Sequence, residues 1–112
     1  MKRVRIEIGN KEYELRFNIN SLIDLADEGV NVLNFDSVDM SLKTIRTMFK
    51  YAIKHGDNKK ITDNRAGELM TEYMQEGHSF NELSEKIIEA LAIAMGGNKE
   101  EVNEVSKEDE GK

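Results

Sequence analysis

The chain has no cysteine, no proline and no tryptophan among its 112 residues. Without cysteine, a disulfide framework, a thiolate metal site and a cysteine nucleophile are all excluded. The same absence suits a reducing compartment, and we therefore expect a cytoplasmic protein. Aromatic residues make up only 6% of the chain, so leucine, isoleucine and methionine must fill most of the core.

Long apolar runs are lacking as well. The longest nearly apolar run covers residues 90–95, far short of the roughly 20 residues that span a bilayer. The basic residues 2–5 are followed by Glu7, Glu12 and Glu14, where a signal peptide would have its apolar region. We predict neither a membrane-spanning segment nor an export signal.

Acidic residues outnumber basic ones, 22 to 16, which gives a net charge of −6. This balance opposes nonspecific attraction to nucleic-acid phosphates. The basic clusters are short: one lies at residues 2–5 and the other at residues 54–60. We therefore predict no nucleic-acid partner.

The first 17 residues alternate between apolar and polar side chains, which is the period of a half-buried strand. Gly9 and Asn10 interrupt the pattern and favour a two-residue turn. The resulting hairpin places Ile6 opposite Tyr13, so all the apolar side chains emerge on one side of it. Those side chains are Val4, Ile6, Ile8, Tyr13, Leu15 and Phe17.

Four helices are predicted beyond the hairpin, and a glycine follows each of them. The first starts at Asn20 as its N-cap, the second at Ser41, the third at Thr62 or Asp63, and the fourth at Ser79. Ser79 and Glu82 have the spacing of a capping box. We interpret residues 30–40 as an ordered loop. The terminating glycines are Gly29, Gly56, Gly77 and Gly96.

These elements predict an α+β fold, in which an N-terminal β-hairpin packs on a small bundle of about four α-helices. Residues 1–97 form the single domain. Residues 98–112 contain six acidic and three lysine side chains but few apolar ones, so they are expected to form an acidic, flexible tail.

No residue pattern assembles a catalytic, cofactor or metal site. Residues 57–62 echo part of a calcium-binding loop, but that alignment puts Lys54 and Arg65 where carboxylates are needed. His55 and His78 each stand beside a helix-ending glycine, where an imidazolium interacts favourably with the carbonyl end of the helix. The acidic residues of the first helix, Asp24, Asp27 and Glu28, are interpreted as a solvated face. We predict that the chain is not an enzyme and needs no cofactor.

The last helix is apolar nearly all round between Ile87 and Met95. Such a helix needs cover on several sides. Two interpretations stand equally: self-association or a partner chain covers it, or it is the central helix of the domain's own core.

Several segments together resemble the tail assembly chaperones of long-tailed bacteriophages and prophages. They are ELRFNIN (residues 14–20), SLKTIRTMF (41–49), AGELM (66–70), SFNEL (79–83) and EAL (89–91). The resemblance covers residues 10–96. It implies a non-enzymatic protein of the bacterial cytoplasm that keeps the tape measure protein soluble while tail tube subunits assemble around it. It also implies that a longer form can arise by frameshifting near residues 98–112.

A long apolar helical client needs adaptable apolar cover, which methionine and isoleucine side chains provide. We therefore predict that the last two helices bind the tape measure protein, and that the tail tube protein or a second copy of the chain are further partners. An alternative is a small acidic regulator or inhibitor that binds a basic protein surface. The predicted partner-binding residues are Met70, Tyr73, Met74, Ile88, Leu91 and Met95.

Overall fold

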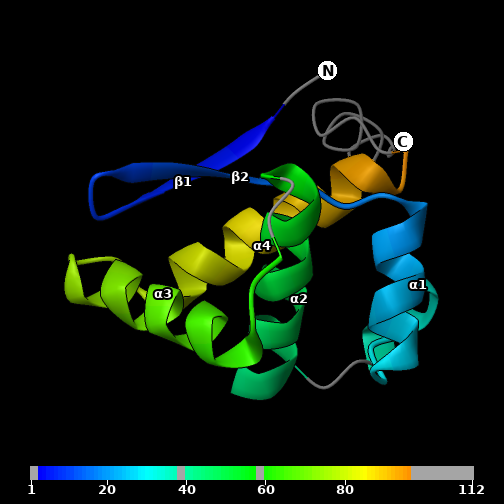
Figure 1. The fold of residues 1–112 in the computed structure, drawn as a ribbon. Coiled ribbons are helices and arrows are strands. Elements are labelled where there is room, and N and C mark those ends of the chain that lie inside the picture. Colours follow the sequence, from blue (N-terminus) through cyan, green and yellow to red (C-terminus); the bar gives the residue numbers. More distant parts are fainter. Residues whose placement is uncertain (1–2, 38–39, 58–59, 97–112) are drawn as a thin grey trace, which may run out of the picture.

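A two-stranded hairpin lies across one side of a group of helices (Figure 1). The computed structural model describes residues 3–37, 40–57 and 60–96. Strands β1 (Val4–Ile8) and β2 (Lys11–Leu15) pair antiparallel, with Ile6 opposite Tyr13 and Val4 opposite Leu15. Gly9 takes a φ of 65° in the turn, a conformation that glycine adopts without strain. The α+β fold and the register of the hairpin are thus confirmed.

Four α-helices follow the hairpin, each starting at a polar N-cap residue. They are α1 (Ile19–Asp27), α2 (Leu42–Gly56), α3 (Asp63–Gln75) and α4 (Phe80–Ala94). The predicted starts at Ser41 and Ser79 are confirmed as N-caps, and so is the capping box between Ser79 and Glu82. Of the two candidates for the start of the third helix, Thr62 and Asp63, the N-cap is Thr62.

One helix boundary was predicted wrongly. The N-cap of α1 is Asn18 rather than Asn20, because Asn18 and Ser21 form a reciprocal capping box that starts the helix earlier. In this box the Ser21 amide donates to Asn18 Oδ1 at 2.9 Å, and the Asn18 amide donates to Ser21 Oγ at 2.7 Å. The predicted loop at residues 30–40 contains a short 3₁₀ helix, η1 (Val32–Ser37).

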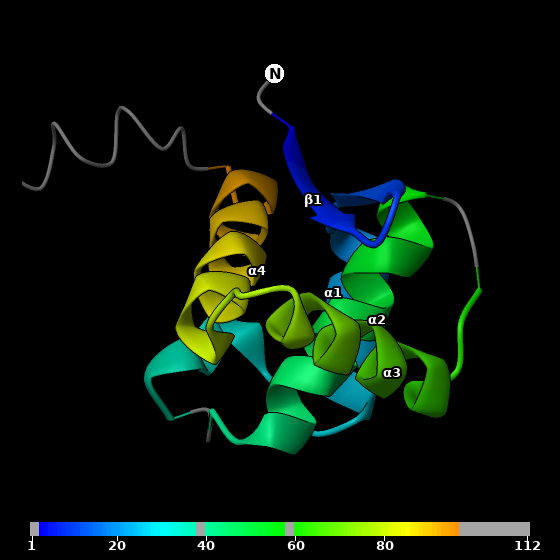
Figure 2. The ribbon, with the colours of Figure 1, turned by 90° about the vertical axis from the view of Figure 1, so that its left-hand side faces the viewer.

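Helix α2 occupies the centre of the domain, the place that one interpretation gave to the last helix. It packs against α1, α3, α4 and β2. Its side chains Ile45, Met48 and Phe49 are at most 1% exposed, while Leu42 in its first turn is 68% exposed. Helix α4 and the end of α3 pack against β1 (Figure 2). The apolar face of the hairpin is therefore covered by helices, as a two-stranded ribbon requires.

The end of α2 joins the outer edge of β2. The backbone amide of Arg16 donates to the carbonyl oxygen of Ala52 at 3.1 Å, and the amide of Glu14 donates to Asp57 Oδ1 at 3.2 Å. Gly56 was predicted to close this helix, and it is the last residue of α2. It is not among the described glycines with positive φ. Its place there has a different reason, because a Cβ at this position would overlap the carbonyl oxygen of Glu14.

Within the described residues, every helix falls short of the length and apolarity needed to cross a membrane. The predicted tail, residues 98–112, lies outside the described residues.

Candidate partner-binding surface

Most of the apolar circumference of α4 is covered within the monomer. Leu83, Ile87, Ala90 and Leu91 are at most 4% exposed. On one flank, Ile93 and Ala94 pack beside the hairpin as half-buried side chains. The exposed apolar side chains of this helix region are Ile88 at 36% and Met95 at 46%.

The six predicted partner-binding residues therefore separate into two sets. Met70, Tyr73 and Leu91 belong to the core, each at most 7% exposed, so they cannot contact a partner directly in this conformation. Met74, Ile88 and Met95 lie on the surface. Only the second set can contribute to a docking surface on the folded domain.

Two of the acidic side chains at α1 stay partly or mostly exposed, as predicted, and also pair with lysines of α2. Glu28 Oε2 lies 3.4 Å from Lys50 Nζ, and Asp24 Oδ2 lies 3.8 Å from Lys54 Nζ. The Tyr51 hydroxyl also donates to Glu28. Asp27 is exposed, as predicted.

Lys50 joins three helices, because its Nζ also lies 2.8 Å from Asp63 Oδ1 at the start of α3. Burial by itself lowers the pKa of Lys50, but Asp63, Tyr51 and Glu28 together raise it above its ordinary value. The hydrogen bond from Lys50 lowers the pKa of Asp63, and the hydrogen bond to Glu28 raises the pKa of Tyr51. These charges thus orient α1 and α3 on α2.

With Ser21 and Leu25 of α1 buried against the rest of the domain, an apolar stripe is left on its outer side. Ile19 is 68% exposed and Ile23 is 53% exposed, and both stand one helical turn apart with Ala26 completing the stripe. We call Ile19, Ile23 and Ala26 the α1 stripe. The sequence pattern did not predict that these apolar residues are exposed. Acidic residues stand next to them in the chain, so the pattern alone does not show which residues face the solvent.

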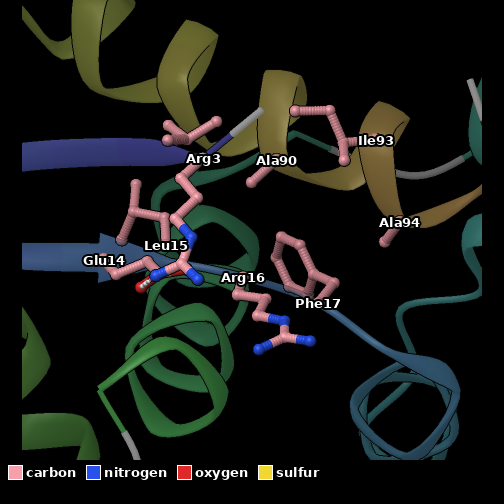
Figure 3. Close-up of a pocket in the computed structure, with 9 residues that line it drawn as sticks. Arg3, Glu14, Leu15, Arg16, Phe17, Ala90, Ile93 and Ala94 are labelled. Carbon is pink, nitrogen blue, oxygen red and sulfur yellow. Dashed lines mark hydrogen bonds and ion pairs between the residues drawn. The ribbon is translucent and has the colours of Figure 1, made fainter. Parts of the chain in front are cut away.

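The start of α1 and the end of α4 lie at the same end of the molecule. Phe17, directly before the N-cap of α1, lines a small pocket of about 40 Å³ together with Ile93 and Ala94 of α4 (Figure 3). Arg3 and Arg16 stand at the rim of this pocket.

Both histidines contact neighbouring side chains of the fold. His78 stacks on Tyr73 with ring centroids 4.1 Å apart and an interplanar angle of 7°, and its Nδ1 lies 3.5 Å from Glu82 Oε1. His55 lies in the last turn of α2, as predicted for the carbonyl end of a helix. Its buried Nε2 atom has no hydrogen-bond partner and lies 3.8 Å from Asp24 Oδ2.

His55 is expected to make the fold less stable in mild acid. Burial, followed by the charge of Lys54, lowers the pKa of His55 below 6.5, while Asp24 acts more weakly in the opposite direction. The unfolded chain therefore binds more protons than the folded chain as the pH falls through 6.5, and stability decreases with it. The melting temperature of His55→Gln should fall less than that of the parent between pH 7.5 and pH 5.5. Equal decreases in the two proteins would contradict this role of His55.

No group of three or more potential metal-ligating side chains occurs among residues 3–37, 40–57 and 60–96. Comparisons of the chain with protein-family models, with curated proteins and with solved structures find no match. A proposal for the function therefore depends on the surface of the domain.

Proposed function

We propose that the chain is a non-enzymatic binding protein that covers an apolar helical client, and that it acts as a tail assembly chaperone for a tape measure protein. The observation that supports this best is the α1 stripe. An amphipathic helix on the outside of a domain ordinarily turns its apolar side inward, whereas α1 leaves Ile19 and Ile23 in solvent.

The exposed apolar side chains of the last helix region are further candidates for contact with the client. Ile88 and Met95 add an isoleucine and a methionine, side chains that adapt to different apolar partners. Large exposed apolar patches mark sites of interaction with other proteins. The tape measure protein, the client implied by the resemblance to tail assembly chaperones, is long, helical and apolar, so it would gain most from such cover.

The alternative proposal, an acidic regulator, has less support from the arrangement of charges. Such a protein must present carboxylates to a basic partner, but Asp24, Glu28 and Asp63 are paired with lysines of α2. The two functions differ in their salt dependence. Binding through apolar contacts persists at high salt, whereas binding through surface charges weakens as salt screens them.

The test uses the tape measure protein encoded in the same tail gene cluster as the probe. We expect the chain to keep this protein in the supernatant after centrifugation at both 0.05 M and 1 M NaCl. Binding that is lost at 1 M NaCl would contradict the chaperone proposal and favour the regulator.

Placing a charge in the apolar surface should abolish this activity. We expect Ile23→Glu and Ile88→Glu to weaken client binding at least tenfold, because an unpaired carboxylate buried under a client is costly. Both side chains are partly or mostly exposed, so circular dichroism should report a folded protein. The matched controls are Asn20→Glu on α1 and Asn81→Glu on α4, which add the same charge at exposed polar positions. Undiminished client solubility with both isoleucine variants would remove this surface from the proposal.

A further inference from the structure

The two outer edges of the hairpin differ in their hydrogen bonds to the rest of the fold. On β2, the outward amides of Glu14 and Arg16 donate to Asp57 and Ala52, at the end of α2. That edge is therefore closed to further pairing. An edge strand that keeps its backbone groups free is a ready template for another strand.

The opposite edge, on β1, is open along Arg5 and Glu7, while the amide of Gly9 just beyond the strand donates to Glu76 Oε2 at 2.6 Å. Glu14 is paired with Arg5, and because the Glu14 amide points away from β1, this pair is of the type that exchanges no backbone hydrogen bonds. The amide and carbonyl of Arg5 must then point outward from β1, and those of Glu7, two residues on, must do the same. In the described part of the chain, no hydrogen bond from another element reaches these outward groups.

The charges along this open edge are complementary to those of the same edge in a second copy of the chain. When two copies of β1 run antiparallel with Ile6 opposite Ile6, Arg5 of each copy stands opposite Glu7 of the other. This register also matches the backbone, since Arg5 and Glu7 are the residues with outward amides and carbonyls, and each such pair exchanges two hydrogen bonds. A shift by two residues in either direction would place Arg5 opposite Arg5 or Glu7 opposite Glu7, and like charges directly opposite are destabilising.

We propose that β1 is a self-association edge, through which a second copy of this chain joins the hairpin to form a continuous four-stranded antiparallel sheet centred on Ile6. In this arrangement Val4, Ile6 and Ile8 of both copies stay on the face covered by helices, and the Arg5–Glu7 pairs lie on the exposed face. The proposal goes beyond client binding, because it uses the hairpin and neither the α1 stripe nor α4.

The surroundings of the edge leave it accessible. Arg5, Ile6 and Glu7 border an open hollow whose other wall includes His78 from the turn after α3 and Lys86 from α4. Helices α3 and α4 contact β1, and the side chains they cover are those of Val4, Ile6 and Ile8, while Arg5 and Glu7 are exposed. Pairing of two short strands buries less than the roughly 1,200–2,000 Å² of a stable interface. We therefore expect a reversible dimer that depends on protein concentration.

Charge reversal provides the test, with the full chain and sedimentation equilibrium as the measurement. The parent mass should rise from that of a 12.8 kDa monomer toward twice that value as the concentration increases. Arg5→Glu alone and Glu7→Arg alone should each weaken dimerisation at least tenfold, because each places like charges opposite one another. An equimolar mixture of these two variants should associate, since every Glu of one then faces an Arg of the other.

The double variant Arg5→Glu/Glu7→Arg restores opposite charges within one chain and should dimerise like the parent. Both positions are exposed, and circular dichroism checks that each variant is folded. A parent that remains monomeric at millimolar concentration would overturn the proposal. So would folded single variants that dimerise as the parent does, or a mixture of the two that fails to associate.

Discussion

The Phe49→Ala variant is expected to lose about 3–5 kcal/mol of unfolding free energy, the usual cost of deleting a fully buried aromatic side chain. Phe49 is 0% exposed and lies on α2, the helix that contacts α1, α3, α4 and β2. The loss is a large share of the 5–15 kcal/mol that holds a typical domain folded. Urea denaturation followed by circular dichroism would measure it.

Leu42→Ala is the matched control for Phe49→Ala. Leu42 belongs to the same helix but is 68% exposed, so its truncation should change the unfolding free energy by less than about 0.5 kcal/mol. If the Phe49 variant unfolded at the same urea concentration as the parent, α2 could not be the centre of the core.

The Gly56→Ala variant is expected to destabilise the fold by about 3 kcal/mol or more, at the upper end of the cost of overpacking. The added Cβ would overlap the carbonyl oxygen of Glu14, a backbone atom that cannot rotate away as a flexible side chain can. Relief requires moving the end of α2 away from β2, which would break the hydrogen bonds that Asp57 and Ala52 accept there. Thermal unfolding would show the loss directly.

Gly67→Ala serves as its control because Gly67 is also a helical glycine, on α3. The nearest atom to an added Cβ there is Arg46 Cδ at 3.6 Å, an ordinary contact. This substitution should stabilise the domain by about 0.5–1 kcal/mol, since alanine favours a helix over glycine. Equal effects at the two positions would show that the approach of α2 to β2 is not the reason for Gly56.

The hairpin was predictable because three local signals agree. The two-residue period, the turn at Gly9 and the apolar pairing of Ile6 with Tyr13 all specify one register, and a shift by one residue would turn the apolar side chains into solvent. The helix starts at Ser41, Thr62 and Ser79 were predictable for a similar reason, since an N-cap side chain bonds to the backbone only three residues away.

The pairing of the α1 carboxylates was not predictable, because their partners lie far away in the sequence. Asp24 and Glu28 resemble a solvated face until Lys50 and Lys54 of α2 are placed beside them. Because Ser21 and Leu25 face the core, Ile19 and Ile23 are left outside. Local pattern records the polarity of a side chain but not the polarity of the surface that it meets.

Which of the candidate binding residues are exposed was not predictable from the sequence, for the same reason. Met70, Tyr73 and Leu91 share the apolar character of Ile88 and Met95, and only tertiary packing separates the buried set from the exposed one. The open edge of β1 likewise became visible only through the hydrogen bond from Glu14 to Asp57, which fixes the direction of the backbone groups in the neighbouring strand.

The packing of β1 against α4 also determines when the protein can finish folding during its synthesis. Ribosomes make β1 first, but α4, which covers part of its apolar face, is joined to the nascent chain on the order of ten seconds later at typical elongation rates. Throughout that interval Val4, Ile6 and Ile8 lack part of their cover, beside a strand edge that is open to other nascent chains. Closely spaced ribosomes on one message would bring such edges together, so this early strand is where association between neighbouring copies would begin.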